Sequence, residues 1–131
     1  MVLRNLSKLD DWPTLHKFWQ AKTGLEIDRK MLPPTGLVAT REDGILLCGG
    51  FLVKSDTSMA SLTCLVGNPL VLKDERSEAL DSVILALVEI AMMSGFSQVG
   101  VATKVPALRA RLERLGFAQL DDGLTCYGGY L

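Results

Sequence analysis

Few side chains in this sequence could transfer a proton near neutral pH. His16 is the only histidine, and an imidazole gains and loses a proton readily in this range, so it is a candidate general base. Tyr127, near the end of the chain, is a second candidate for acid–base chemistry because a phenol can exchange a proton with a reacting group. A helix histidine or a strand tyrosine is more often a packing residue. The sequence therefore gives two candidates and no firm catalytic assignment.

The cysteines and the overall composition exclude several classes of protein. Cys48, Cys64 and Cys126 are odd in number, far apart and without metal-ligand spacing, so we expect buried, reduced thiols and no metal site. A net charge of −1 argues against a nucleic-acid partner. No hydrophobic run approaches the roughly 20 residues of a membrane span. We expect a single domain over residues 1–131, cytoplasmic, without membrane or nucleic-acid partners.

The elements that would position a site are clearest between Asp74 and Phe117. Hydrophobic residues recur there at the spacing of a helix that packs on a sheet; they are Leu80, Val83, Ile84, Leu87, Val88 and Ala91. Gly95 follows, where a left-handed helix end is expected. A short buried strand is predicted at Ser97–Thr103, and Pro106 begins a second helix. Strand ends and helix N-termini meet in such a unit, so a ligand site is expected there.

The other segments predict an antiparallel sheet around this unit. In chain order they are a strand at Val2–Leu6, a helix from Asp11 to Gly24, a short helix within Leu25–Leu32, strands at Leu37–Thr40, Ile45–Val53 and Met59–Val66, and a final hairpin of Ala118–Leu120 and Leu124–Tyr130. Gly44 closes a turn typical of a hairpin. Gly49 and Gly50 inside a strand predict a bulge or close packing against bare backbone.

This order of elements resembles the fold of the GCN5-related N-acetyltransferases. Three segments carry the resemblance: Ala107–Phe117 is similar to the family's fourth helix, Met92–Phe96 to the end of its third helix, and Leu65–Pro69 to the exit of its central strand. The resemblance implies a mixed α/β (α+β) fold. We expect a central, mostly antiparallel sheet of six to seven strands flanked by about four helices.

The resemblance also implies that acetyl-CoA is bound as a substrate. The family's central strand carries a bulge that meets the acetyl group, here near Cys64, Leu65 and Val66. The pyrophosphate would lie on the first turn of the next helix, and that segment is expected to place four residues beside it: Arg76, Ser77, Glu78 and Ala79. The family's glycines are missing from this loop. Either Arg76, Ser77 and Lys73 contact phosphate, or the acidic residues are an ordinary helix start without an anion site.

The expected catalytic positions depart from the family's pattern. A frequent tyrosine of the fourth helix corresponds to Leu112, and a frequent asparagine corresponds to Val105. Backbone amides around Leu65 and Val66 could still stabilise an oxyanion. The arginines of this helix form either a solvated face or a contact to the phosphate of the coenzyme's adenosine; they are Arg109, Arg111 and Arg114.

Two functions follow from the resemblance. The first is an N-acetyltransferase that moves an acetyl group from acetyl-CoA to a primary amine by direct attack. The second is a catalytically inactive binding or assembly module, similar to compact acetyltransferase-like proteins of bacteriophages. An unrelated α+β fold is a third possibility. The acceptor would be a small-molecule or protein amine, and a homodimer through the last strands is compatible with the family.

Overall fold

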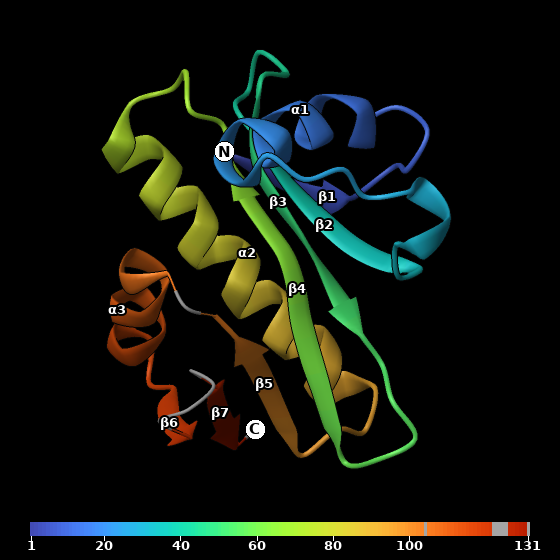
Figure 1. Ribbon diagram of the computed structural model, residues 1–131, viewed down its shortest axis with the longest axis vertical. Helices are drawn as coiled ribbons and strands as arrows, with labels where there is room; N and C mark the ends of the chain where they lie inside the picture. The colour runs from blue at the N-terminus through green and yellow to red at the C-terminus, as the bar shows by residue number, and fades with distance from the viewer. Residues whose placement is uncertain (104, 122–125, 131) are drawn as a thin grey trace.

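The computed structural model describes residues 1–103, 105–121 and 126–130, with side chains up to residue 119 (Figure 1). In this part of the chain seven strands form one sheet, in the order β1-β2-β3-β4-β5-β7-β6. The strands are β1 (Val2–Asn5), β2 (Thr35–Thr40), β3 (Leu46–Val53), β4 (Met59–Gly67), β5 (Gln98–Ala102), β6 (Ala118–Asp121) and β7 (Cys126–Tyr130). The helices are α1 (Trp12–Thr23), the 3-10 turn η1 (Arg29–Met31), α2 (Lys73–Met93) and α3 (Pro106–Arg114).

Among the described strands, only one neighbouring pair is parallel. β4 and β5 run in the same direction, and the five other pairs are antiparallel. The helix α2 makes the crossover between these two strands, as a parallel connection requires. The predicted mixed, mostly antiparallel sheet is confirmed.

The second of the four expected helices is only a single 3-10 turn, η1. The Asp28 side chain accepts a hydrogen bond from the backbone N–H of Lys30 at 2.9 Å and so caps the N-terminus of this turn. Pro33 and Pro34 follow closely, and a residue before proline is restricted to extended conformations. The segment therefore has no room for a regular helix.

Helices cover both faces of the sheet, and each face has its own hydrophobic cluster. The larger cluster lies between the sheet and the helices α2 and α3; its buried members include Leu37, Leu47, Leu52, Leu62, Val83, Ile84, Leu87, Val99 and Leu112. The second cluster lies under α1 and consists of Trp12, Leu15, Leu32, Val38, Phe51 and Val66. Figure 1 shows α2 crossing behind β4, and α3 lying beside α2. None of the helices in the described part of the chain has the length and hydrophobicity that a membrane span requires.

The helix α2 has the buried stripe that its sequence predicts. Val83, Ile84 and Leu87 are fully buried against the sheet. After the helix, Gly95 has a positive φ of 92°, and its N–H donates to the carbonyl of Met92 at 3.0 Å. Glycine adopts this left-handed conformation without a steric penalty. The predicted end of the helix is confirmed.

A charged cluster fixes α3 against α2. Asp81 of α2 accepts hydrogen bonds from Arg111 Nη1 at 2.6 Å and from Arg114 Nη2 at 2.9 Å. Burial alone would raise the pKa of Asp81, but these two hydrogen bonds outweigh it, and the pKa is lowered. The carboxylate therefore stabilises the folded state when it is ionised.

Acid is expected to weaken this attachment of α3. Because the folded-state pKa of Asp81 lies below its unfolded value, its contribution is complete above pH ~4 and is lost as the pH falls through the lower folded pKa. Between pH 7 and pH 3, urea unfolding should show a loss of stability that is roughly 1 kcal/mol smaller in Asp81→Asn than in the natural chain. An equal acid-induced loss in the variant and in the natural chain would contradict this role.

Candidate functional site

A cleft opens where β4 and β5 separate. Their parallel pairing ends at Ser61 and Gly100. Beyond this point Leu62–Leu65 of β4 and Val101–Thr103, at the end of β5, line opposite sides of a hollow, which α1 and the start of α3 also border. We call this hollow, with its extension to the first turn of α2, the β4–β5 cleft. It lies at the carboxyl ends of two parallel strands, the position that the sequence predicts.

A bulge in β4 forms one wall of the cleft. The pairing of β3 with β4 shifts by one residue at this point. Gly49 pairs with Val66 but Phe51 pairs with Thr63, so β4 has one residue more than β3 between the two pairs. Cys64 has φ 52°, the only positive φ of a non-glycine residue among those described. A bulge leaves backbone groups outside the regular hydrogen-bond ladder. The bulge predicted near Cys64 and Leu65 is therefore confirmed, whereas the Val66 side chain is buried under α1.

The cysteines of the described chain do not have the character of nucleophiles. Cys48 is buried in the core, and desolvation raises its pKa to about 12. Cys64 is half-buried at the bulge, where burial raises the pKa of its thiol. A thiolate, not a thiol, is the reactive form. Both thiols are free, as expected, and Cys126 lies outside the residues whose side chains are described.

The left-handed backbone at Cys64 predicts an unusual response to substitution. Cys64→Val is expected to lower the free energy of unfolding by about 1–2 kcal/mol, since a β-branched side chain is strained at this φ. Cys64→Gly removes that strain and is expected to cost less than the valine variant. Chemical denaturation of both variants would check the order, and a glycine variant less stable than the valine variant would contradict it.

The loop that leads from β4 into α2 is tied down by its own side chains. The Asn68 side chain donates to the carbonyl of Leu46 and accepts from the N–H of Leu70, both at 2.9 Å. Arg76 Nη1 donates to the carbonyl of Asn68 at 3.1 Å. The stem of Arg76 lies so close to Gly67 that a Cβ at this glycine would be 2.6 Å from Arg76 Cδ. The guanidinium is thus held beside the helix N-terminus.

The first turns of α2 separate their charges onto two faces. Lys73, Arg76 and Ser77 line the cleft. Glu75 instead accepts a hydrogen bond from Arg41 Nη2 at 2.6 Å, which lowers the pKa of Glu75. Glu78 lies on the same side as Glu75, beside Met1 and Arg41, and Ala79 is buried in the core. Leu65, Arg76 and Ser77 are therefore brought to the cleft, whereas the side chains of Glu78 and Ala79 are not.

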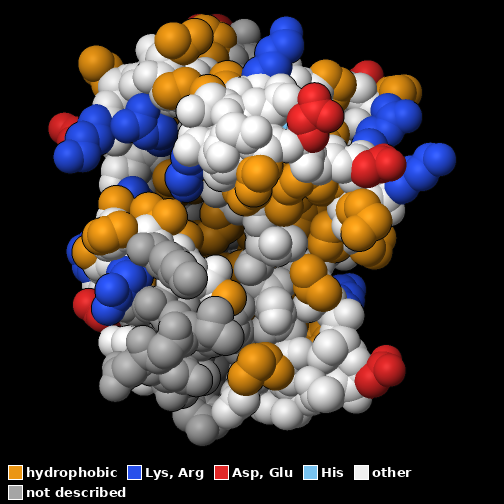
Figure 2. Space-filling model, in the orientation of Figure 1, with side chains coloured by type: hydrophobic (Ala, Val, Ile, Leu, Met, Phe, Trp, Pro, Cys, Tyr) orange, Lys and Arg blue, Asp and Glu red, His pale blue; other side chains and the backbone are white. Residues whose placement is uncertain are grey.

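The cleft is positively charged. Its described lining contains four cationic side chains and no carboxylate; the cations are Lys22, Lys73, Arg76 and Arg111. Figure 2 shows a hollow with a hydrophobic interior and Lys and Arg side chains along its edge. Clefts lined by one sign of charge concentrate ligands of the opposite sign. The arrangement favours an anionic ligand with an apolar portion.

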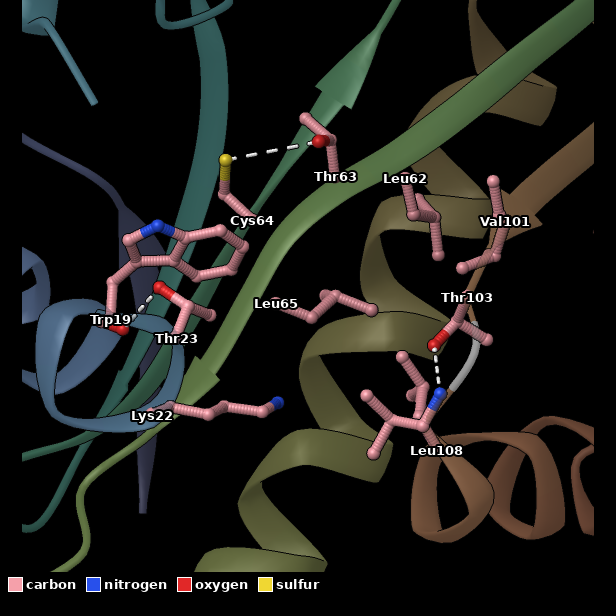
Figure 3. Close-up of a pocket in the computed structure, with 12 residues that line it drawn as sticks. Trp19, Lys22, Thr23, Leu62, Thr63, Cys64, Leu65, Val101, Thr103 and Leu108 are labelled. Atoms are coloured by element: carbon pink, nitrogen blue, oxygen red, sulfur yellow. Dashed lines mark hydrogen bonds between the residues drawn. The ribbon is translucent and has the colours of Figure 1, made fainter. Parts of the chain in front are cut away.

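Lys22 is a charged residue of the cleft lining that no pattern in the sequence marks. It lies in the last turn of α1, where a lysine is an ordinary complement to the helix dipole. Figure 3 shows its side chain extending from α1 past the end of β4, below Leu65 in this view. Burial lowers the pKa of Lys22. Only the placement of α1 over β4 reveals this role.

Arg111 holds α3 in place as well as lining the cleft. Its Nη1 donates to the backbone carbonyl of Ser77 at 2.8 Å and to the Ser77 hydroxyl at 3.0 Å. From the sequence, the arginines of this helix are expected either to form a solvated face or to contact the phosphate of the coenzyme's adenosine. A bond from Arg111 to α2 is not expected from the sequence. The helix presents Leu108 and Val105 to the cleft, whereas Leu112 is fully buried. The expected catalytic tyrosine position is therefore in the core.

The two acid–base candidates have different outcomes. His16 Nε2 accepts a hydrogen bond from the backbone N–H of Ile27 at 3.1 Å, and its ring stacks on Trp12 with 5.4 Å between the centroids. Both contacts pack His16 against its neighbours, and it is not among the described residues that line the cleft. Tyr127 pairs through its backbone with Val101, which lines the cleft. Its side chain lies outside the part of the chain whose side chains are described.

Comparison with known proteins identifies the fold. No family model matches the sequence, and no curated protein matches it either. Among solved structures, a GCN5-related N-acetyltransferase from Kribbella flavida superposes with a TM-score of 0.81 at 14% identity, over 99% of this chain and 97% of that one. A phosphinothricin acetyltransferase from Sinorhizobium meliloti, in complex with acetyl-CoA, gives 0.79 at 11% identity, over 99% and 88%.

A third neighbour is the N-acetylglutamate synthase of Neisseria gonorrhoeae, complexed with coenzyme A and N-acetyl-glutamate. It gives a TM-score of 0.78 at 13% identity, over 99% of this chain and 35% of that one. Two of these three neighbours are therefore known with acetyl-CoA or coenzyme A bound. The chain has the fold of the GCN5-related N-acetyltransferases.

Proposed function

We propose that this chain, with its N-acetyltransferase fold, binds acetyl-CoA in the β4–β5 cleft and transfers the acetyl group to a primary amine. The observation that carries the proposal is the combination of a bulged strand with a cationic cleft that has no carboxylate in its described lining. Acetyl-CoA has a matching chemistry, since an apolar thioester arm leads to several phosphate groups. The acetyl-CoA complexes of proteins with this fold support the same ligand.

The phosphate groups would lie at the first turn of α2. The helix N-terminus carries unpaired N–H groups and a partial positive charge. Arg76 and Lys73 add two full charges on the same face, while Arg41 holds Glu75 away from it. Arginine and lysine side chains would thus attract the phosphate groups, which the family's glycine loop instead holds by letting its backbone come close to them. The proposed phosphate contacts are Arg76, Ser77 and Lys73. Glu78 and Ala79 lie in the second turn of α2, where backbone N–H groups are bonded within the helix, so they are not among the proposed contacts.

The thioester would lie at the bulge of β4. Backbone N–H groups near Leu65 that are released from the ladder can stabilise the oxygen that becomes negative when an amine attacks the carbonyl. The amine nitrogen bonds to the carbonyl carbon, the C–S bond breaks, and the sulfur of coenzyme A leaves with the proton that the amine loses. Holding the two reactants together accounts for much of the acceleration of such a reaction.

A second candidate function is a binding module without turnover. It is favoured by the apolar residues Val105 and Leu108 on the α3 side of the cleft and by the packing role of His16. Such a module would bind coenzyme A and hold it without reacting. The acceptor of the first function would be a small-molecule or protein amine. Two solved structures with this fold, an N-acetylglutamate synthase and a ribosomal-protein-alanine N-acetyltransferase, are named after acceptors of these two kinds.

Release of the coenzyme A thiol separates the two functions. The full chain is incubated with acetyl-CoA and a panel of amines, including amino acids and peptides with free N-termini, and the thiol is detected with a disulfide reagent. Acetyl transfer predicts amine-dependent thiol release above the uncatalysed rate. Binding of acetyl-CoA without release on any amine would support the module instead, and absence of binding would overturn both.

A further inference from the structure

Lys22 reaches the part of the cleft where the thioester would lie. Its side chain leaves the last turn of α1 and runs past the end of β4, below Leu65 in the view of Figure 3. It lines the same hollow as Cys64 and Leu65 of the bulge, and also the adjoining hollow formed by Gly67 and Arg76. One flexible side chain can therefore present its amine to either the acyl end or the phosphate end of a ligand in the cleft.

No described group pairs with the amine of Lys22. Among the described residues, neither a hydrogen bond nor an ion pair joins its Nζ to an acceptor, and burial is the cause that lowers the pKa of Lys22. The charged side chains that share the cleft lining are Lys73, Arg76 and Arg111, of which Arg111 is paired with Asp81 behind the lining. The side chain as a whole is exposed to solvent, so Lys22 can move into the cleft and out of it. The neutral amine is the form that attacks a thioester.

We propose that Lys22 is itself an acetyl acceptor, modified by the acetyl-CoA that the chain binds. The inference rests on the proposed function, because the donor must occupy the β4–β5 cleft. Nζ of Lys22 forms a bond to the thioester carbonyl carbon, and the C–S bond breaks. Coenzyme A departs as a thiolate and takes up the proton that the amine loses, so the products are an amide on Lys22 and free coenzyme A.

The modification would change the cleft that produces it. Acetylation removes one of the four positive charges of the lining and adds a neutral, partly apolar group beside Leu65 and Leu108. Electrostatic attraction of the phosphates would fall. Self-acetylation would therefore weaken the hold on acetyl-CoA and limit further turnover, which makes Lys22 a regulatory modification site.

Intact-mass and peptide mass spectrometry of the full chain tests this inference. After incubation with acetyl-CoA, the expected product carries one acetyl group on the peptide that contains Lys22. Lys17 lies on the same helix, is exposed and does not line the cleft, so it serves as the matched control. Proximity predicts that Lys22 is modified at least about tenfold faster than Lys17. Lys22→Arg should abolish the main product, and Lys17→Arg should leave it unchanged.

Two further measurements make the result decisive. In urea-unfolded chain the preference for Lys22 should disappear, since it depends on the cleft. Binding of acetyl-CoA to the natural chain is measured in parallel by calorimetry. If acetyl-CoA binds and Lys22 stays unmodified, or is modified no faster than Lys17, this inference is wrong while the proposed function stands. If acetyl-CoA does not bind, the proposed function fails first.

Discussion

Replacing Arg76 with glutamate is expected to abolish the stabilisation of this protein by coenzyme A. The guanidinium is fixed beside the N-terminus of α2 by the carbonyls of Asn68 and Val71, at 3.1 and 3.4 Å. Reversing its charge puts a carboxylate where the phosphates would lie. A ligand at a thousandfold excess over its Kd stabilises the folded state by about 4 kcal/mol, and the variant should lose nearly all of this.

The effect of Arg76→Glu on the free protein should be much smaller. Loss of two hydrogen bonds costs about 1–2 kcal/mol, and a carboxylate in the first turn of a helix is itself favourable. Thermal unfolding with and without coenzyme A separates the two effects. Arg29 in η1 is exposed and does not line the cleft, so Arg29→Glu is a control with the same change of charge. An Arg76→Glu variant stabilised as much as this control would exclude the proposed phosphate site.

A methyl group at Gly50 is expected to damage both the fold and the cleft. A Cβ at this position would lie 2.5 Å from Leu65 Cδ2 and 3.5 Å from Leu87 Cδ1. Overpacking of a filled core typically costs about 1–3 kcal/mol. Because Leu65 belongs to the bulge, the displaced side chain should also narrow the cleft. Gly50→Ala is therefore predicted to unfold at lower urea concentration and to bind coenzyme A more weakly.

A double-mutant cycle tests whether the contact between position 50 and Leu65 causes the loss of stability in Gly50→Ala. Leu65→Ala makes room for the added methyl group, so Gly50→Ala should cost less in the Leu65→Ala background than in the natural chain. Residues in direct contact show coupling energies of about 0.5–3 kcal/mol. Additive effects, with no coupling between the two positions, would show that Gly50 acts through something other than Leu65.

Local patterns in the sequence predicted much of the fold correctly. The stripe through Val83 and Leu87 and the glycine that ends it depend only on residues near one another in the chain, and both are confirmed. Adjacent glycines at 49 and 50 predicted a close contact or a bulge, and the structure has both. The short helix expected within Leu25–Leu32 is present only as the three-residue 3-10 helix η1, because a single capped turn lies between a loop and two prolines.

The site was harder to predict because its residues come from distant segments. The sequence shows Glu75 next to Arg76, but not that Arg41, 34 residues before Glu75, turns this carboxylate away from the cleft. Lys22 is remote from the predicted phosphate loop, and nothing in its immediate neighbours marks it. Likewise, whether Leu108 or Leu112 faces the cleft depends on the rotation of α3, which Arg111 and Asp81 fix.

Titration calorimetry with three ligands tests the central claim most directly. Acetyl-CoA and coenzyme A carry the phosphates that the cationic cleft should hold, whereas pantetheine carries the same thiol arm without them. We predict that the first two bind, that pantetheine binds at least about tenfold more weakly, and that the difference shrinks at high salt. No heat of binding with millimolar acetyl-CoA, or equal affinity for pantetheine, would contradict the account.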